Sequence, residues 1–418
     1  MEVKPGYKPT EIGPIPEEWN LKGLGEVASL DVGLSKPGIV FGSGCPVVTV
    51  QDLYSGATVS VAGLKRVVVT NEEIQKYRLT KDDILIGNAS VKRDGIGYAN
   101  RFDGAVEDVI FAKYAYRASN LRSILPLYLL YALRADFCRH WIVANSQTGT
   151  LTNLNKAAAR AIPIPVPETI GEQRAVASAV FDVDALLAGL DRLIAKKRDL
   201  KQAAMQQLLN GQTRLPSFQG EWKAAQLGEV CAFRTGPFGS ALHKSDYISD
   251  GVPLVNPMHI VDGTIIPTRD MTVTTHAAHR LSEFLLREGD VIIGRRGDMG
   301  RCAVVRRRQH GWLCGTGSLI VRVVHDAVPE FIQRILSSRQ VITAIENSSV
   351  GTTMTNLNQG VLRQLGLRLP EPSEQAAIAA VLSVMDAELT ALEARRDKTR
   401  ALKQGMMQEL LTGRTRLV

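Results

Sequence analysis

The sequence predicts a mixed α/β protein made of two copies of one unit, each a globular block followed by a long helix. Two observations predict this class: landmarks that recur at a nearly constant offset, and apolar residues at heptad spacing in two segments. In a chain of 418 residues, 45% hydrophobic and 22% charged residues are typical of packed domains rather than of disorder.

Four landmarks recur 202 or 203 residues apart along the chain. Segment 24–27 (LGEV) recurs at 227–230, segment 152–155 (TNLN) at 355–358, and the pair Glu172-Gln173 as Glu374-Gln375. Segment 201–215 matches 403–417 at ten of fifteen positions. We therefore expect an internal duplication with a pseudo-two-fold axis. Its parts are a first globular block at 14–167, a first long helix in 168–215, a second block at 216–370 and a second long helix in 371–418.

The globular blocks contain β-branched runs that predict short strands. Examples are residues 47–50, 67–69 and 291–293, separated by Gly, Asn and Asp. A stretch rich in proline then ends each block, at 161–168 and 365–372, and cannot continue a helix.

The two helices are predicted to run for about 39 residues each, or roughly 58 Å. Thr169 and Glu172 have capping-box spacing at the start of the first helix, and Gly211 and Gly413 are placed as C-terminal glycines. The predicted pairing seam comprises Val176, Val180, Val183, Leu187 and Leu190 in the first helix and Ile378, Leu382, Met385, Leu389 and Leu392 in the second. The seam resumes at Leu200, Ala204 and Leu208, and at Leu402, Met406 and Leu410.

Two apolar stripes in one chain are most simply buried against each other as an antiparallel coiled coil. A short connection after Gly211 favours this arrangement over a parallel pair. The alternative is that each amphipathic helix packs on its own block. A second strip, formed by Met205, Leu209, Met407 and Leu411, lies off the seam and is predicted to pack on a globular block or to dock a partner.

Several kinds of site and location are excluded or disfavoured by missing motifs. The chain has no GxxxxGK[ST] loop, and Asn256-Pro257-Met258 is not the Asn/Asp-Pro-Pro-aromatic loop of adenine methyltransferases. We expect no catalytic residues, no cofactor and no metal site. No run approaches 18 apolar residues and no apolar leader is present, so we predict neither a membrane span nor a secretory signal. Five scattered cysteines without a CxxC pair indicate core residues in a cytoplasmic protein.

The duplicated plan carries a family resemblance. The helix starts GEQRAVASAVFDVDALLAGL and SEQAAIAAVLSVMDAEL, the ends LLNGQTRL and LLTGRTRL, and RTGPFGSALHKSDY (234–247) resemble specificity subunits of type I restriction–modification systems. The resemblance covers about residues 14–418. It implies a non-catalytic subunit with two target-recognition domains that bind double-stranded DNA. It also implies paired helices that dock two methyltransferase subunits and, in the full complex, restriction subunits. The first block departs from the pattern, with DVGLSKPGIVFGSG (31–44) where the second has its GPFGS loop.

This role is consistent with the net charge of +8 and with the energetics of base recognition. A mismatched base pair costs roughly 1–3 kcal/mol, so two joined readers discriminate far better than one. Because the two blocks differ in sequence, we expect a split, asymmetric target. A coiled-coil scaffold without sequence-specific DNA binding is the alternative, and an enzyme with an unrecognised site is a third.

Candidate DNA-binding residues are cations, amides, small hydroxyls and aromatic residues in loops, because these groups contact phosphates and base edges. Ordinary surface turns and solvated charges are the alternative interpretation of the same residues. For the TNLN segments a structural role in turns and caps is favoured. The candidates in the first block are Asn88, Ser90, Lys92, Arg93, Gln147, Thr148 and Thr150. Those in the second are Arg234, Thr235, Phe238, Ser240, His243, Lys244, Tyr247, Arg295, Arg296, Arg301, Thr352 and Thr353.

Overall fold

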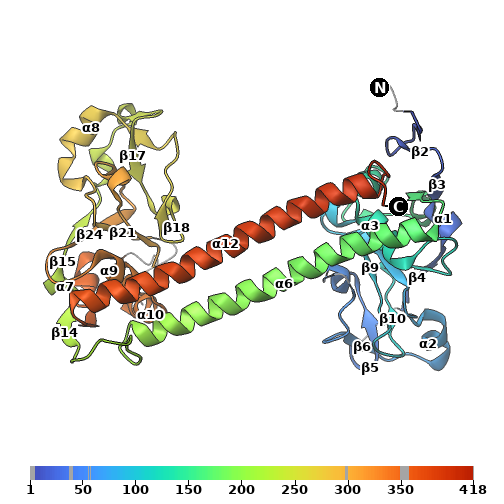
Figure 1. The fold of residues 1–418 in the computed structure, drawn as a ribbon, viewed down its shortest axis with the longest axis horizontal. Helices are drawn as coiled ribbons and strands as arrows, with labels where there is room; N and C mark the ends of the chain where they lie inside the picture. The colour runs from blue at the N-terminus through green and yellow to red at the C-terminus, as the bar shows by residue number, and fades with distance from the viewer. Residues whose placement is uncertain are drawn as a thin grey trace. The chain divides into compact units, whose positions relative to one another are not determined.

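The computed structural model of the chain describes residues 5–36, 41–54, 56, 58–296, 300–348 and 357–417. Internal contacts divide the chain into two compact units. Unit 1 comprises residues 1–192 and 393–418, and unit 2 comprises residues 193–392. Each unit therefore combines one globular block with parts of both long helices, whose elements are labelled in Figure 1.

Unit 1 contains a four-stranded antiparallel sheet in the order β4-β11-β7-β9. Its strands are β4 (Ser29–Val32), β11 (Ala115–Ser119), β7 (Ile84–Gly87) and β9 (Ala99–Arg101). Strand β7 is buried along its whole length, as its uninterrupted apolar run predicts. A second sheet, in the order β10-β5-β6, pairs β10 in parallel with β5. Its strands are β5 (Phe41–Val48), β6 (Lys65–Val67) and β10 (Ile110–Phe111).

Short elements complete the block of unit 1. The two-stranded pairs are β1 (Tyr7–Lys8) with β2 (Ile15–Pro16), β3 (Asn20–Gly23) with β13 (Pro163–Val166), and β8 (Ala89–Ser90) with β12 (Thr152–Asn153). The helices are α1 (Leu24–Val27), α2 (Asn71–Tyr77), α3 (Pro126–Arg134), α4 (Asp136–Ala144) and α5 (Lys156–Ala161), with 3₁₀ turns η1 (Val50–Tyr54) and η2 (Arg93–Gly95). The main core lies between the sheet and α3, around the fully buried Tyr128 and Tyr131.

Unit 2 repeats both sheets. Its antiparallel sheet has the order β15-β24-β21-β22, with β15 (Cys231–Thr235), β24 (Ser318–Val323), β21 (Val291–Gly294) and β22 (Cys302–Val304). The second sheet has the order β16-β20-β17-β23, with β16 (Tyr247–Ile248), β20 (Thr272–Val273), β17 (Val252–Val255) and β23 (Leu313–Cys314). Strands β17 and β23 run parallel, as β5 and β10 do in unit 1.

The remaining elements of unit 2 follow unit 1 in part, with β14 and β25 pairing as β3 and β13 do. Its two-stranded pairs are β14 (Lys223–Gln226) with β25 (Gly366–Leu369), and β18 (Ile260–Val261) with β19 (Thr264–Ile265). The helices are α7 (Leu227–Val230), α8 (Thr275–Arg280), α9 (Pro329–Leu336), α10 (Arg339–Ser348) and α11 (Gln359–Arg363). The 3₁₀ turns are η3 (Gly239–Ala241), η4 (Lys244–Asp246), η5 (Pro257–His259), η6 (Ser282–Phe284) and η7 (Arg307–Gln309).

The two long helices have the predicted length. Helix α6 (Ile170–Leu208) and helix α12 (Pro372–Leu410) each contain 39 residues. Gly211 and Gly413 follow them with φ of +74° and +67°, the left-handed conformation predicted for a C-terminal glycine. Each glycine also lies directly against a tryptophan ring, of Trp222 and Trp19 respectively, where a Cβ would be crowded.

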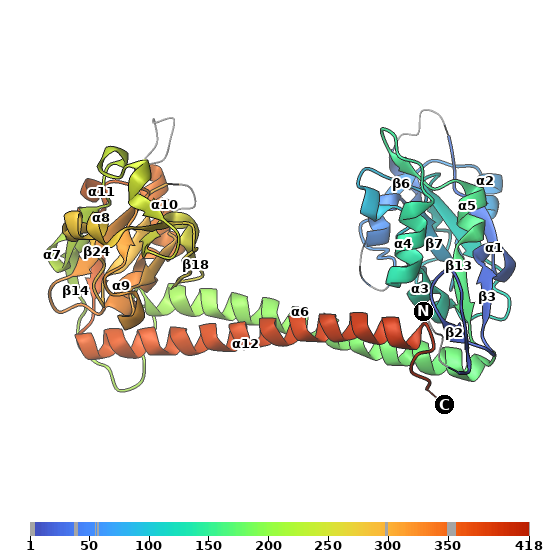
Figure 2. The same ribbon diagram turned by 90° about the horizontal axis from the view of Figure 1, so that it is seen from above.

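A buried glutamine joins each long helix to its block. The Gln173 side chain accepts from the backbone N–H of Leu125 (2.9 Å) and donates to the Ser123 carbonyl (3.0 Å). Gln375 has the same role in unit 2. Its side chain accepts from Val328 N–H (2.8 Å) and donates to the Asp326 carbonyl (2.9 Å). The helix starts are therefore tied to the segments that precede α3 and α9. Figure 2 shows α9 beside the start of α12.

The glutamate before each glutamine binds other partners than a capping box would give it. Thr169 does accept from the Glu172 N–H (3.1 Å), but the Glu172 carboxylate binds Trp19 Nε1 (3.2 Å) and the guanidinium of Arg416 (3.0 Å). In unit 2 Glu374 receives two bonds from Arg214, at 2.6 and 2.7 Å. Each carboxylate at a helix start is thus paired with an arginine that follows the end of the other long helix. This exchange explains why each unit includes parts of both helices.

Within each unit the segments of α6 and α12 run in opposite directions. In unit 1, Asp184 pairs with Lys403 (2.6 Å), while Val176 and Val180 share a core with Met407 and Leu410. In unit 2, Lys197 pairs with Glu388 (2.6 Å). Val176 and Val180 also pack in the core of their own block, as the alternative to a coiled coil predicts.

The predicted continuation of the seam is wrong at two positions. Leu200 and Leu402 are 50% and 59% exposed, although the heptad phase placed them inside.

The second apolar strip, in contrast, packs on the globular blocks. Met407 and Leu411 are buried in the core of unit 1, and Met205 and Leu209 pack against the core of unit 2. Of the two interpretations of that strip, packing on a globular block fits this arrangement, because buried side chains are not available to a partner.

One described helix, α12, passes a length and composition test for a membrane span, with an 18-residue window of mean hydropathy 1.4. This result was not predicted from the sequence, because alanine and serine separate the larger apolar residues of the helix and leave no uninterrupted apolar run. Ile378 and Leu382 in this helix are fully buried in the core of unit 2. Val381 and Val384 are 38% and 60% exposed, so packing against the block accounts for part of the apolar surface of this segment. All five cysteines are buried and unpaired, as predicted for core residues.

Candidate nucleic-acid interface

Backbone hydrogen bonds join several loops at one end of the main sheet of unit 1. Gly33 N–H donates to the Ala115 carbonyl (3.3 Å), and Ala112 N–H donates to the Val48 carbonyl (2.9 Å). Asn88, directly after β7, connects two further segments: its N–H donates to the Tyr114 carbonyl (2.9 Å) and its carbonyl accepts from Leu154 (2.9 Å). We call residues 32–36, 48–54, 87–90, 111–115 and 151–154 loop cluster 1.

Unit 2 builds the same network from equivalent positions. Gly236 N–H donates to the Ser318 carbonyl (3.0 Å), and Gly315 N–H donates to the Val255 carbonyl (2.9 Å). Arg295, directly after β21, donates from its N–H to the Gly317 carbonyl (2.8 Å) and accepts from Leu357 N–H (3.0 Å). Residues 235–238, 255–260, 294–296, 314–318 and 357 form loop cluster 2. The two blocks therefore share a backbone scaffold at this end of their sheets.

The shared scaffold corrects the expected difference between the loops at 31–44 and 234–247. A Cβ at Gly33 would lie 2.2 Å from the Ala112 carbonyl oxygen, and one at Gly236 would lie 2.0 Å from that of Gly315. Both positions require glycine for the same close approach of two backbones. The loops after β4 and β15 therefore begin alike, although the residues that follow the glycines differ.

Asn88 and Arg295 have a structural role that the sequence did not predict. Asn88 Nδ2 donates to the Lys113 carbonyl (3.1 Å), and Arg295 donates from Nη1 to the Thr316 carbonyl (3.5 Å) and from Nε to the Leu357 carbonyl (3.2 Å). Burial, followed by the charge of Arg296, lowers the pKa of Arg295. These bonds use the Nε proton and one Nη1 proton of Arg295, and its role in base reading stays a prediction.

The first-block candidates are brought together by a short strand pair. Strand β8 pairs with β12, with Ser90 opposite Thr152, and this places the segment 88–93 beside the loop 147–150. The loop is closed by two backbone bonds between Gln147 and Asn153, of 2.8 and 2.9 Å. Lys92 and Arg93 are exposed at the turn that follows β8. The sequence predicted both segments as candidates, and only the fold makes them neighbours.

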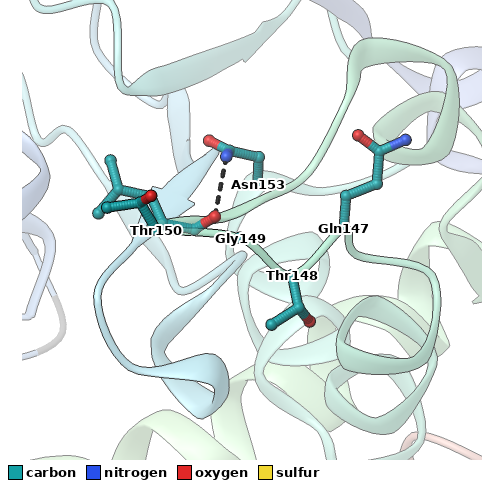
Figure 3. A pocket seen from close by; sticks show the side chains of 6 residues that line it. Gln147, Thr148, Gly149, Thr150 and Asn153 are labelled. Carbon is teal, nitrogen blue, oxygen red and sulfur yellow. Dashed lines mark hydrogen bonds between the residues drawn. The ribbon is translucent and has the colours of Figure 1, made fainter.

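The loop 147–153 lines an open hollow of about 440 Å³. Figure 3 shows the side chains of Gln147, Thr148 and Thr150 pointing in different directions, and the Asn153 amide donating to the Leu151 carbonyl (3.0 Å). All three candidate side chains are exposed. Side chains that diverge over an open surface suit contact with a large, extended ligand better than enclosure of a small molecule.

The second-block candidates after β15 are divided between internal bonds and exposure. Arg234 pairs with Glu283 (2.5 Å), and Thr235 Oγ1 accepts from Gln359 Nε2 (3.0 Å). Phe238 is 80% exposed and Ser240 is also exposed. The structure therefore ties Arg234 and Thr235 to neighbouring elements of unit 2 and leaves Phe238 and Ser240 available on the surface.

His243 and Lys244 lie at the 3₁₀ turn η4, directly before Tyr247 in β16 of the second sheet of unit 2. All three side chains are exposed around η4 and the start of β16. The buried Asp246 accepts from His243 N–H (2.8 Å) and from Arg280 (2.7 Å), which fixes the backbone of this turn. These bonds to His243 and Arg280 hold the pKa of Asp246 below its usual value.

The remaining second-block candidates have mixed outcomes. Arg296 and Arg301 are exposed after β21 and before β22. Thr352 and Thr353 lie outside the described residues. The TNLN segments have the structural role that was favoured: Asn155 caps α5 by accepting from Ala158 N–H (2.8 Å), and Asn358 caps α11 by accepting from Val361 N–H (3.0 Å).

Several exposed residues of the two loop clusters were not among the candidates. Gln51, Lys113 and Tyr114 are exposed in loop cluster 1, and Met258 is 63% exposed in loop cluster 2. Gln51 and Met258 lie in the 3₁₀ turns η1 and η5, directly after β5 and β17. Their position after predicted strands was the only available signal, because neither residue belongs to a recurring motif.

A family model described as the type I restriction modification DNA specificity domain matches the chain twice, at residues 16–196 and 219–400. The two matches coincide with the two copies found in the sequence.

Individual relatives agree with this family match. In Methanocaldococcus jannaschii, a chain named as the type I restriction enzyme MjaX specificity subunit is 23% identical and covers 98% of this chain and 97% of its own length. The type I restriction enzyme MjaVIII specificity subunit of the same organism is 21% identical, with 96% and 94% covered. The crystal structure of a type I restriction–modification S subunit from M. genitalium has the same fold, with a TM-score of 0.58, 15% identity and 98% of both chains covered.

Proposed function

Because the chain belongs to the type I restriction–modification DNA specificity family, we propose that it is the DNA-recognition subunit of such a complex and reads a split, asymmetric target. The observation that carries this proposal is the pair of loop clusters. They have the same backbone hydrogen bonds but different exposed side chains, as two readers of unlike sequences require. The chain itself needs no catalytic residue, cofactor or metal for this role.

The energetics favour two readers over one. Each mismatched base pair costs roughly 1–3 kcal/mol, so a block that reads three or four pairs supplies on the order of 7 kcal/mol. Two blocks in one chain add their discrimination without a second translational cost. Exposed cations such as Lys92, Arg93 and Lys244 would contact phosphates, and the exposed side chains of the loop clusters would contact base edges.

We infer that α6 and α12 form an antiparallel coiled coil that sets the spacing of the half-sites. Support comes from the opposite directions of the helix segments inside each unit and from the ion pairs Asp184–Lys403 and Lys197–Glu388. Leu190 and Leu389 on the predicted seam are 5% and 8% exposed. An unread spacer between two short specified blocks follows from such a separation.

The two most exposed leucines of the long helices are the proposed docking positions for methyltransferase subunits. Leu200 on α6 and Leu402 on α12 are equivalent residues of the repeat, and one lies in each unit. Equivalent exposed positions in the two units suit two copies of one partner, because the same surface is presented twice. Restriction subunits would join this assembly in the full complex. Buried, unpaired cysteines are consistent with a cytoplasmic location.

Methylation mapping tests the recognition role. The chain is expressed with its methyltransferase partner in a host without other methylation, and the modified sites are sequenced. We expect one split motif that vanishes when the gene for this chain is deleted. If methylation has no defined motif, or the chain protects no sequence in a footprint, the scaffold alternative replaces the proposal.

The docking positions are tested separately by copurification. Leu200→Asp and Leu402→Asp are each expected to reduce the methyltransferase recovered per chain about twofold, and the double variant is expected to remove it. Gln202→Asp, an exposed neighbour on α6, is the matched control and is expected to retain full recovery. Full recovery with the double variant would exclude these positions.

A further inference from the structure

We infer that Gln51 and Met258 are equivalent base-reading residues, one in each block. Gln51 would contact an adenine of the first half-site, and Met258 a thymine methyl group of the second. This inference rests on the proposed function and adds to it the residues that determine specificity. Neither residue belongs to the recurring motifs, but the two residues occupy equivalent positions in the two loop clusters.

The equivalence follows from strand register and hydrogen bonds. Val48 pairs with Phe111 in the parallel strands of unit 1, and Val255 pairs with Cys314 in those of unit 2. Three residues later, Gln51 and Met258 occupy the same position of the following 3₁₀ turn. Leu53 and Ile260, two residues further on, are both buried, with 0% and 1% exposure. The turns η1 and η5 are therefore the same structural element.

Each turn is closed by a side chain that immediately follows the proposed reader. In unit 1, the Asp52 carboxylate accepts from Thr49 N–H (2.7 Å) and from Thr49 Oγ1 (2.8 Å). In unit 2, His259 Nδ1 accepts from Asn256 N–H (3.1 Å). Different residue types thus make the same cap, and the backbone that carries Gln51 or Met258 is fixed before any ligand binds.

Glycines under the two turns bring them close to the end of the central strand. A Cβ at Gly87 would lie 3.3 Å from Val50, and a Cβ at Gly294 would lie 3.2 Å from Pro257. Gly87 and Gly294 end β7 and β21, so the turns that carry Gln51 and Met258 lie close to Asn88 and Arg295, which directly follow these strands. The residues that hold the loops together are therefore distinct from those left for a ligand.

The exposed side chains have the chemistry of base contacts. Gln51 is exposed, and its amide offers one donor and one acceptor, which match the N7 and N6 groups of adenine in the major groove. Met258 is 63% exposed next to a turn that is otherwise well packed, and an apolar side chain contacts the thymine methyl group. An exposed methionine on a rigid turn has no packing role in unit 2.

Substitution of the readers tests this inference in the complete complex. Gln51→Ala is expected to lower the preference at one position of the first half-site about 10- to 100-fold, as loss of a bidentate contact predicts. Met258→Ala is expected to relax one position of the second half-site about 5- to 10-fold, because only an apolar contact is lost. The measurement is methylation of a library of randomised targets, sequenced and compared with wild type.

Matched controls keep the outcomes distinct. Gln75→Ala on α2 and Ile266→Ala after β19 remove exposed residues of similar type from the same blocks and are expected to leave the motif unchanged. Unchanged preferences in both reader variants, or a change in the opposite half-site, would overturn the inference while leaving the proposed function intact. Absence of any motif with the wild-type chain would instead reject the proposed function.

Discussion

Loop clusters 1 and 2 differ in their exposed side chains and agree in their backbone. Ala112 and Gly315 donate to equivalent carbonyls at 2.9 Å in both. Lys113 and Tyr114 of the first cluster nevertheless stand where the second has Thr316 and Gly317. Because main-chain groups and glycines specify the scaffold, the outward positions are free to differ. A protein can therefore carry two readers of unlike sequences on one architecture.

The largest loss of stability is expected when the glycine that each cluster requires is replaced by a residue with a Cβ. Gly33→Ala and Gly236→Ala are each expected to destabilise their own unit by about 3 kcal/mol, because the added methyl group meets a carbonyl oxygen. Local hydrogen exchange, read separately in the two units, measures the loss. Gly366→Ala, with no atom within 4 Å of the added Cβ, is the control. A harmless Gly33→Ala would show that the two clusters are not equivalent.

Substitution of the buried carboxylates before β7 and β21 is expected to destabilise the two units to different extents. Asp290 binds Arg322 through both oxygens at 2.8 and 2.7 Å, so Asp290→Asn is expected to cost about 3 kcal/mol by leaving the arginine without its charge partner. Burial raises the pKa of Asp83, so its charge is unfavourable in the folded state. Asp83→Asn is therefore expected to cost less than about 1 kcal/mol at neutral pH. Denaturant unfolding of each variant, with exchange protection by unit, checks the difference.

A smaller difference in stability is expected between substitutions of the two tryptophans that cover the ends of the long helices. Trp19 Nε1 donates to Glu172 at 3.2 Å, whereas the buried Nε1 of Trp222 has no hydrogen-bond partner among the described residues. Trp19→Phe is therefore expected to destabilise unit 1 by about 1.5 kcal/mol more than Trp222→Phe destabilises unit 2. Equal losses would mean that the Trp19 hydrogen bond adds nothing to stability.

The smallest effect concerns the pH dependence of η5. Burial lowers the pKa of His259 below its ordinary value of 6.5, so the neutral ring that accepts from Asn256 is the folded form. The unfolded chain takes up a proton first, and unit 2 is expected to lose stability as the pH falls below 6.5. Hydrogen exchange of the η5 amides at pH 7.5 and 5.5 measures this. His259→Asn should abolish the loss in unit 2.

Much of the architecture could be predicted from periodicity and repetition. The capping glycines and the heptad spacing gave the correct length for α6 and α12, because local chemistry starts and stops a helix. The same spacing failed at Leu200 and Leu402, where no neighbouring surface in the described chain covers the predicted inner position. Heptad phase identifies a stripe along a helix, and only packing decides how far that stripe is covered.

Sequence and structure give different information about the candidate site, for a physical reason. Sequence chemistry identified Arg295 as a base reader, but its guanidinium is bonded to the carbonyls of Thr316 and Leu357. The same reasoning passed over Gln51 and Met258, which have no distinctive neighbours in the sequence. A polar side chain can bind either its own backbone or a ligand, and the residue type alone does not distinguish these roles.

The sequence by itself determined the duplication, the two long helices and the kind of protein, because these depend on recurring residues and local spacing. The tertiary structure decided which carboxylate each terminal arginine binds: Glu172 pairs with Arg416 and Glu374 with Arg214, each across the repeat. It also decided which loops meet at the end of each sheet. Both outcomes depend on contacts between residues far apart in the chain, and the strand register that creates them is fixed only when the whole core packs.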